Sequence, residues 1–495
     1  MKHRPRGILL LFVGLGIWLS AAWINLYRFS LPWMDTWCYL APAAARPSPF
    51  HLQTPLLGGF AAGDHTWGLH FPGAPLIYSC VFSLIGFRPS IAALMFLSAW
   101  IALAVLTGRL VFELTRTGFW AIAAAAIVLC DRSLFAICQA QRPELFGSID
   151  VLVVWLAIAG LPPFRGRFRF LCAACGCYLL PLLHPVTLAA GAGICLFLAV
   201  QSRRGGEERR KLALVSWLGY ASGGLTLFLW FRLQPDAWSQ FVDHASVNMV
   251  PFSYGLSFWR ALQGFYYPTF TGHLLWVTSL VAAAAALYSW LGGRSEANPA
   301  SLPGAVILIT CMIAHQKFHN GFYLGLYFPE AVVIALLLAH EAEKRGAFAG
   351  NPSLARFCVC LFIAVHGLFW TTRTLKFWQS GRPRVRTELA QIVGGFPERR
   401  KVLIPEVLWE AALDDPARFS MNTLPNGATS ERRKAYEGFA YGRLSPGDFA
   451  VVDRFQAFQP MVKFGGRDWT FVGNFRHVFP GRSEWGYELT IWRKN

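Results

Sequence analysis

Eleven long apolar runs, separated by short polar stretches, limit what this chain can fold into. A helix needs about 20 mostly apolar residues to cross the hydrocarbon core of a membrane. Of the 495 residues, 55% are hydrophobic and only 15% are charged, whereas soluble domains average about 25% charged residues. We therefore predict an α-helical polytopic membrane protein with about eleven spans. The expected spans are residues 8–27, 89–108, 119–138, 144–160, 170–183, 186–200, 212–231, 273–291, 302–315, 323–339 and 355–372.

The basic residues indicate how the chain crosses the membrane. The apolar run 73–87 is too short for a span, so we expect a juxtamembrane helix that lies on the membrane. With a cytoplasmic N-terminus, the inner segments then carry 17 Lys and Arg, against 8 on the outer segments before the tail. Cytoplasmic loops are enriched in these residues, so we predict the cytoplasmic (inner) membrane and an extracytoplasmic C-terminus. The net charge of +18 thus reports orientation, and no nucleic-acid partner is expected, since such binders carry a basic stripe on a soluble face.

The composition changes near residue 375, which suggests two domains. Residues 1–375 form the transmembrane domain, and residues 376–495 contain no apolar run long enough to span. Short β-rich runs bounded by turn residues predict a small extracytoplasmic α/β domain. The expected strands are Lys401–Ile404, Phe449–Val452, Trp469–Phe475 and Tyr487–Trp492.

The first outer loop, residues 28–72, is long and carries several ionisable side chains. Loops of this length are uncommon unless they are functional or disordered, and the many aromatic residues argue for packing. Asp35 follows the first span directly, where partial desolvation would raise its pKa and suit it to act as a general base. Asp64 and His70 lie further along the loop. The structural alternatives are a helix-capping or solvated Asp35 and a simple turn at His70.

More polar groups stand at the outer ends of later spans. Arg142-Pro143-Glu144 opens the fourth span, with the proline at a typical helix start and Glu144 where the helix dipole favours an anion. His184-Pro185 forms another outer turn, and a third contains Lys317, His319 and Tyr323. Together these groups suit a cavity for an anionic head group, although ordinary loop chemistry is the alternative.

The order of these motifs resembles the GT-C superfamily of membrane glycosyltransferases, especially the protein-mannosyltransferase and lipid A aminoarabinose-transferase-like group. An acid with aromatic residues after the first span is matched by Asp35–Tyr39, and a His-Pro entry to a juxtamembrane helix by His70–Leu76. An Arg-Pro-acid step is matched by Arg142–Glu144, a later His-Pro turn by His184-Pro185, and a basic, tyrosine-containing segment by Lys317–Pro329. The resemblance covers roughly residues 1–340.

The resemblance implies transfer of a sugar from a polyprenyl-phosphate carrier to an extracytoplasmic acceptor, which is a lipid, glycan or protein. It makes Asp35 the catalytic base, although the second acid that often follows in the family is replaced by Thr36, so Asp64 is the candidate for it. The residues expected to bind the donor phosphate or sugar are His70, Arg142, Glu144, His184, Lys317, His319 and Tyr323. Relatives with monophosphate carriers imply no obligate cofactor, with a divalent metal as the alternative.

Two other classes of protein remain as alternatives. A transporter or lipid flippase would also be polytopic and would be surrounded by membrane lipids, but it should show inverted repeats and broken midplane helices. The sequence contains no convincing pair of such repeats. A non-enzymatic scaffold of the cell envelope would explain the C-terminal domain but not the ordered ionisable turns.

Overall fold

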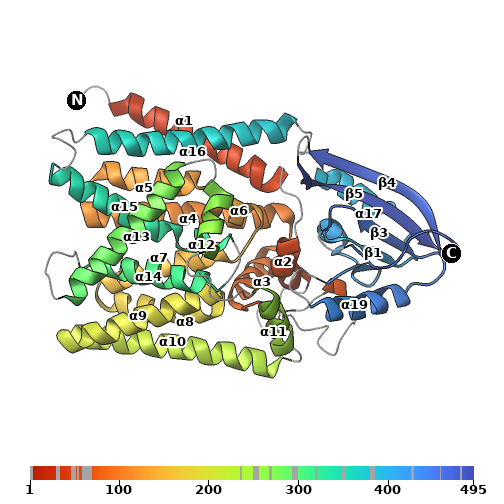
Figure 1. Ribbon diagram of the computed structural model, residues 1–495, viewed down its shortest axis with the longest axis horizontal. Helices are drawn as coiled ribbons and strands as arrows, with labels where there is room; N and C mark the ends of the chain where they lie inside the picture. The colour runs from red at the N-terminus through yellow and green to blue at the C-terminus, as the bar shows by residue number, and fades with distance from the viewer. Residues whose placement is uncertain are drawn as a thin grey trace.

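A helical bundle is followed by a small sheet domain in the computed structural model (Figure 1). The structure describes residues 4–28, 34–45, 52, 55–57, 70–234, 237–248, 256–266, 270–292, 299–317, 321–346, 353–379, 385–424, 429–456, 459–479 and 482–495. The helices that precede the sheet domain in the chain are α1 (Arg4–Trp23), η1 (Ile24–Arg28), α2 (Met34–Ala45), η2 (Pro55–Leu57), α3 (Gly73–Ile85), α4 (Pro89–Thr115), α5 (Gly118–Cys130), α6 (Arg132–Gln139), α7 (Glu144–Ala159), α8 (Gly166–Leu183), α9 (Pro185–Arg204), α10 (Glu207–Leu233), α11 (Ala237–Asn248), α12 (Leu256–Tyr266), α13 (Phe270–Leu291), α14 (Leu302–His315), α15 (Tyr323–Lys344) and α16 (Ser353–Gln379).

Each predicted span overlaps a helix or, for residues 119–138, the bent pair α5–α6. In the part of the chain that the structure describes, seven helices are long and apolar enough to cross a membrane, or eight if α5 and α6 form one span bent by 49°. The polytopic helical architecture is therefore confirmed, while the number eleven stays a prediction.

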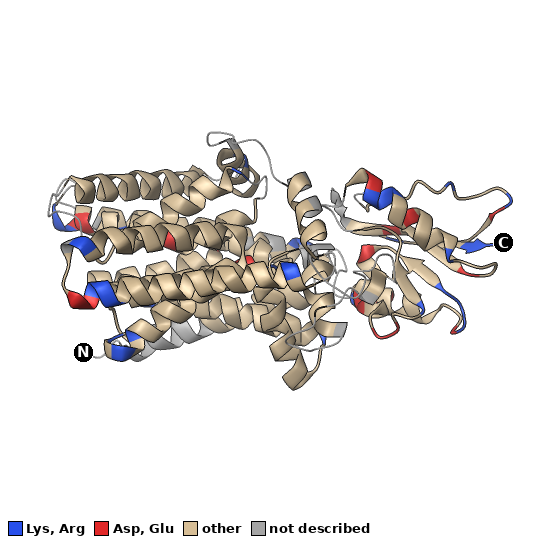
Figure 2. Cartoon of the chain, turned by 90° about the horizontal axis from the view of Figure 1, so that it is seen from below, with Lys and Arg blue, Asp and Glu red and all other residues tan. Residues whose placement is uncertain are grey.

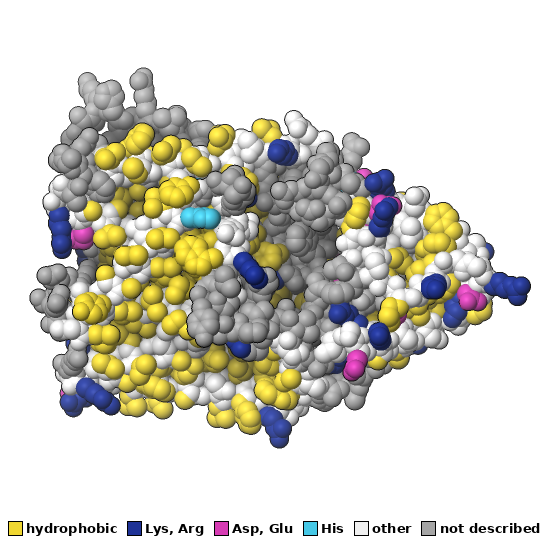
Figure 3. All heavy atoms as spheres, in the orientation of Figure 1, with side chains coloured by type: hydrophobic (Ala, Val, Ile, Leu, Met, Phe, Trp, Pro, Cys, Tyr) yellow, Lys and Arg dark blue, Asp and Glu magenta, His cyan; other side chains and the backbone are white. Residues whose placement is uncertain are grey.

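The helices differ in how much of their surface faces outward. In an apolar 18-residue segment of each helix, only 22%, 22% and 12% of the residues are buried in α10, α13 and α16. In α15 the buried share is 72%. Hydrophobic side chains spread over the bundle face in Figure 3. A helix that is apolar all round is buried or faces lipid, so α15 is central and the other three form the lipid-facing surface.

Close packing joins α8 to α10. Gly219 and Gly223 stand one helical turn apart on α10, and an added Cβ would lie 2.2 Å from the Ala174 carbonyl oxygen and 2.1 Å from that of Tyr178. Small residues four apart let membrane helices approach closely. The two glycines therefore set the distance between these helices.

Two interruptions shape the helices that lead to the polar end of the bundle. Asp131 separates α5 from α6, and its side chain accepts a hydrogen bond from the Leu134 backbone N–H at 2.8 Å, which caps α6. Within α15 the backbone leaves the helical region at Tyr327 (φ −121°, ψ 15°), two residues before Pro329. A proline removes a helical hydrogen bond and kinks the helix.

Short helices α2 and α3 lie between the bundle and the sheet domain (Figure 1). The predicted juxtamembrane helix is α3, an apolar helix of 13 residues. The first outer loop, residues 28–72, contains α2, which is helical despite Pro42 and which the sequence did not predict. Trp37, Tyr39 and Leu40 of α2 are buried, so tertiary packing stabilises a helix that its proline disfavours.

The C-terminal domain contains a five-stranded sheet in the order β2-β1-β3-β5-β4. Its elements are α17 (Val385–Gly394), β1 (Val402–Ile404), η4 (Glu406–Leu408), α18 (Trp409–Ala412), β2 (Phe419–Met421), α19 (Ser430–Gly442), β3 (Phe449–Asp453), β4 (Trp469–Phe479) and β5 (Arg482–Lys494). Strand β1 is parallel to β2 and β3, and β5 is antiparallel to β3 and β4. The four predicted strands are confirmed as β1, β3, β4 and β5, and β2 was missed.

The sheet domain packs directly on the bundle. Arg386 of α17 donates a hydrogen bond to the Tyr27 carbonyl oxygen of η1 at 2.5 Å and forms an ion pair with Glu410 at 2.9 Å. The rings of Phe87 and Trp409 lie 6.0 Å apart across the same junction. The end of the bundle that carries α2 and α3 thus faces the sheet domain.

Lys and Arg gather at the opposite end of the bundle, away from the sheet domain (Figure 2). This arrangement matches the basic segments that the sequence assigns to the cytoplasmic side.

Candidate active site

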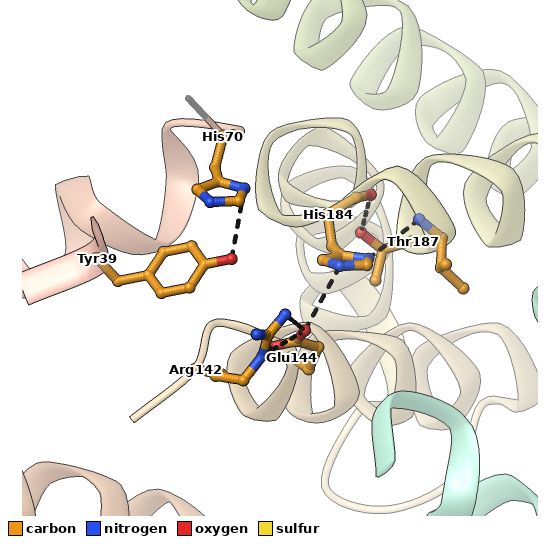
Figure 4. Close-up of polar contacts among 7 residues, drawn as sticks. Tyr39, His70, Arg142, Glu144, His184 and Thr187 are labelled. Carbon is orange, nitrogen blue, oxygen red and sulfur yellow. Dashed lines mark hydrogen bonds and ion pairs between the residues drawn. The ribbon is translucent and has the colours of Figure 1, made fainter. Parts of the chain in front are cut away.

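An arginine and a glutamate form a buried ion pair in the turn between α6 and α7. The Arg142 Nε donates hydrogen bonds to both carboxylate oxygens of Glu144, at 2.9 and 3.2 Å, and its Nη2 donates to Oε1 at 2.7 Å (Figure 4). Arg142 is 3% exposed and Glu144 is 0% exposed. Such charge-assisted bonds fix the plane of the guanidinium, so Arg142 is held in one orientation.

His184 approaches the same carboxylate from the turn between α8 and α9. Its Nδ1 accepts a hydrogen bond from the Val186 backbone N–H at 3.2 Å, and its Nε2 lies 3.8 Å from Oε1 of Glu144. Burial, and next the charge of Arg142, lowers the pKa of His184 to about 3. The imidazole is therefore neutral at pH 7. Because Nδ1 is an acceptor, Nε2 carries the hydrogen, and its distance of 3.8 Å from Glu144 is too long for a hydrogen bond.

Aromatic rings pack around the Arg142 guanidinium. Its central carbon lies 4.5 Å from the centroid of the Phe322 ring and 5.8 Å from that of Tyr39. The Tyr323 ring stands edge-on to His184, with centroids 4.4 Å apart. A cation over an aromatic face is stabilised by the ring quadrupole, more strongly where water is excluded. Tyr39 belongs to a predicted sequence motif but had no predicted role, and Phe322 was not predicted as a site residue.

Helix α2 brings the first outer loop to this cluster. The Tyr39 hydroxyl lies 3.4 Å from His70 Nδ1, and the two rings are 4.6 Å apart (Figure 4). The Thr36 hydroxyl donates a hydrogen bond to the Ala140 carbonyl oxygen at 3.1 Å, two residues before Arg142. The backbone of Asp35 lies in the first turn of α2, next to this contact, and its side chain lies outside the described part of the structure.

Of the remaining predicted residues, the structure describes Lys317, and no contact joins its side chain to the described residues of the cluster. Lys317 follows the C-terminal end of α14, where its backbone N–H donates to the Ala314 carbonyl oxygen at 3.0 Å. Within the described ranges its side chain forms no ion pair. Asp64 and His319 fall outside the described residues. The structure thus brings together His70, Arg142, Glu144, His184 and Tyr323.

This arrangement can bind an anion while excluding water. Arg142 supplies a buried positive charge, and His184 supplies a neutral N–H donor beside it. Among the described residues, no group of three or more His, Cys, Asp or Glu side chains is placed to hold a metal ion. The polar groups that the structure gathers are suited to a phosphate or a carboxylate.

The bundle, the two short helices before its polar end and the sheet domain beyond them define a class: the chain has the GT-C fold of polytopic membrane glycosyltransferases. In particular, it is similar to ArnT from Cupriavidus metallidurans bound to undecaprenyl phosphate, with a TM-score of 0.61, 12% identity and 98% of each chain covered. It is also similar to the oligosaccharyltransferase AglB from Archaeoglobus fulgidus in complex with an inhibitory peptide and a dolichol-phosphate, with a TM-score of 0.51 and 12% identity over 89% of this chain and 69% of that one. No family model and no curated protein matches the sequence.

Proposed function

We propose that this protein is a membrane glycosyltransferase that takes a sugar from a polyprenyl-phosphate carrier. The observation that carries the proposal is the buried Arg142, oriented by Glu144 and enclosed by aromatic rings at the end of the bundle that faces the sheet domain. The likeness in fold to a structure with bound undecaprenyl phosphate supports the same choice of carrier. The acceptor is a lipid, glycan or protein outside the cytoplasmic membrane.

In this proposal each polar group has a defined task. Arg142, with Lys317 as the second cation, compensates the charge of the donor phosphate, which makes the phosphate a better leaving group. Glu144 orients Arg142, and the His184 Nε2–H donates to a phosphate oxygen. His70, Tyr323 and His319 line the donor site.

The proposed chemistry is a single displacement. The acceptor hydroxyl loses its proton to Asp35 and attacks the anomeric carbon of the sugar. A new carbon–oxygen bond forms while the bond from the anomeric carbon to the phosphate oxygen breaks, and polyprenyl phosphate leaves with the bonding electron pair. One displacement inverts the anomeric centre, whereas retention requires a second nucleophilic carboxylate, for which Asp64 is the candidate.

The positively charged end of the bundle supports an orientation. Since cytoplasmic loops carry the excess of Lys and Arg, we place that end and the N-terminus in the cytoplasm. The Arg142 cluster and the sheet domain then lie outside. We also place the boundary between the two domains at residue 375.

Transfer by the purified full-length protein tests the proposal. The protein in lipid nanodiscs is given undecaprenyl phosphate carrying a radiolabelled hexose, pentose or aminosugar, with cell-envelope extract as the source of acceptors. Labelled product is expected from one donor, and EDTA should leave its rate unchanged. Asp35→Asn should reduce the rate at least about 100-fold, as expected for the loss of a general base, without weakening donor binding. Near-full activity of Asp35→Asn would remove Asp35 as the base, and substrate accumulation in vesicles without transfer would favour a transporter.

A further inference from the structure

Three buried polar side chains near Arg142 and Glu144, in space or along the chain, have no hydrogen-bond partner among the residues that the structure describes. They are the Tyr78 hydroxyl of α3, the Gln141 carboxamide of the α6–α7 turn and the Ser148 hydroxyl of α7, and none forms a hydrogen bond with a described residue. Native proteins pair the large majority of buried polar atoms, so each exception calls for an explanation.

The Tyr78 hydroxyl lies close to the ion pair. It interacts electrostatically with Glu144, Arg142 and Cys138, and the residue is completely buried. The ring packs against Phe96 and Phe146, with centroids 5.6 and 5.4 Å away. These apolar contacts hold the ring in place near the ion pair, and they do not involve its hydroxyl.

Gln141 is unusual in both its backbone and its side chain. Its φ of +52° lies in the left-handed region, which a residue other than glycine rarely adopts. The residue is 1% exposed, yet neither its amide nitrogen nor its amide oxygen has a partner in the described structure. The Gln141 backbone N–H donates to the Cys138 carbonyl oxygen at 3.2 Å. Cys138 is also one of the residues that interact with Tyr78, so the Gln141 turn lies near Tyr78. Strain and an unpaired polar group in one residue are typical of functional sites.

Ser148 stands one helical turn after Glu144 on the same face of α7. Buried Thr107 and Thr115 donate their hydroxyls to the carbonyl oxygens four residues earlier, at 2.7 and 2.8 Å. Ser148 is completely buried and does not form this local bond with any described residue. Its hydroxyl is therefore left for a partner from outside the helix.

The chemistry of these groups identifies the ligand. A phosphate at pH 7 offers almost only hydrogen-bond acceptors, which would satisfy the Gln141 amide nitrogen but leave its oxygen unpaired. A sugar hydroxyl both donates and accepts, so the hydroxyl groups of a sugar match the amide oxygen and the amide nitrogen as well as the two hydroxyls. We propose that Tyr78, Gln141 and Ser148 form a neutral subsite that binds the hydroxyl groups of the donor's sugar, beside the phosphate at Arg142. This subsite rests on the proposed function and adds the selection of the sugar to it.

Binding of two kinds of lipid separates the subsite from the phosphate site. The full-length protein in nanodiscs is titrated with undecaprenyl phosphate alone and with undecaprenyl phosphate carrying a hexose, a pentose or an aminosugar. The wild-type protein should bind one glycosylated lipid at least about 10-fold more tightly than the bare lipid, because a site built for hydroxyls discriminates against their absence. Tyr78→Phe removes only the hydroxyl, and Gln141→Gly removes the amide while relieving the left-handed backbone.

Both variants should lose most of the 10-fold gain that the sugar provides and keep the affinity for the bare lipid. Tyr178→Phe is the matched control, since the Tyr178 hydroxyl lies 3.2 Å from the Thr226 hydroxyl between α8 and α10, and it should leave both affinities unchanged. If the variants keep the full gain, the three groups bind only water and the subsite is wrong. If the wild-type protein binds both lipids equally, the subsite is wrong but the phosphate site stands. If neither lipid binds, the proposed function itself is overturned.

Discussion

The bundle and the sheet domain each contain a glutamate beside a histidine and a tyrosine, but in opposite surroundings. In the bundle, Glu144 is 3.8 Å from His184, whose ring meets Tyr323. In the sheet domain, Glu388 is 3.6 Å from His477 and accepts a hydrogen bond from the Tyr487 hydroxyl at 3.0 Å.

The two sites differ in how deeply the glutamate is buried and in whether an arginine is paired with it. The Glu144 side chain is completely buried and paired with Arg142, whereas the Glu388 side chain is 42% exposed. Glu388 lines an open groove of about 620 Å³ between α17 and the β4–β5 pair. A buried charge must be paired, while an exposed one is stabilised by water. The glutamate therefore belongs to a rigid charged centre in the bundle and to a solvated rim in the sheet domain.

The largest effect is expected from Arg142→Ala. It would leave Glu144 buried without its partner, which costs about 3–5 kcal/mol, and it would remove the proposed phosphate ligand. We expect loss of detectable sugar transfer and a lower thermal unfolding temperature in detergent. Arg142→Lys should recover much of the stability and little of the activity, since an ammonium cannot reproduce the two-pronged contact. An active Arg142→Ala protein would show that the enclosed centre is only structural.

Acidic pH should lower the stability of the bundle because buried His184 resists protonation in the folded state. Its folded pKa of about 3 lies below the ordinary 6.5, so its contribution to stability is present above pH 6.5 and is lost as the pH falls toward 3. His184→Asn keeps an acceptor for the Val186 N–H and cannot be protonated. We expect the stability of the wild type relative to this variant to fall by about 1.4 kcal/mol per pH unit below pH 6.5. Parallel unfolding curves of the two proteins between pH 7 and pH 4 would contradict the neutral, enclosed histidine.

In the sheet domain, the buried carboxylate of Asp453 should lower the stability of the folded protein at neutral pH. Burial raises the pKa of Asp453 to about 6, against the opposing backbone hydrogen bonds from Glu488 and Phe455. The stability linked to this raised pKa is present below about pH 4 and is lost as the pH rises through 6. Asp453→Asn should therefore stabilise the full-length protein at pH 7.5 by about 1–3 kcal/mol and have little effect at pH 4. Equal unfolding temperatures at pH 7.5 would show that the carboxylate is well solvated.

The smallest effect is expected from Glu388→Gln. The side chain is partly exposed and its ion pair is weak, so the change in stability should stay below about 1 kcal/mol. Sugar transfer should be unchanged. Loss of transfer with intact folding would instead make the groove a part of the active site.

The sequence was sufficient for the features that depend on local patterns. Apolar runs of helical length predicted the bundle, and short β-rich runs bounded by turns predicted β1, β3, β4 and β5. Strands β1 and β2 both have three residues, but β1 is a continuous apolar run (Val-Leu-Ile) whereas β2 is interrupted by Ser420, so only β1 gave a signal. Pro42 disfavoured a helical prediction for α2.

The candidate site was predicted as a set of motifs but not as a geometry. Arg142, Glu144 and His184 each stand at the outer end of a predicted span, so the sequence placed them on the same side of the membrane but did not say which of them touch. The Phe322 ring against Arg142, the Tyr78 hydroxyl and the strained backbone of Gln141 depend on tertiary packing. No local pattern encodes contacts between residues so far apart in the chain.

The hydrogen bond from Arg386 to the Tyr27 carbonyl joins residues 359 positions apart. During synthesis at about 5–20 residues per second, the η1 carbonyl is made roughly 20–70 s before its partner. The junction between η1 and α17 can therefore form only after all the helices of the bundle have been made, so the first span waits for its partner throughout the synthesis of the others.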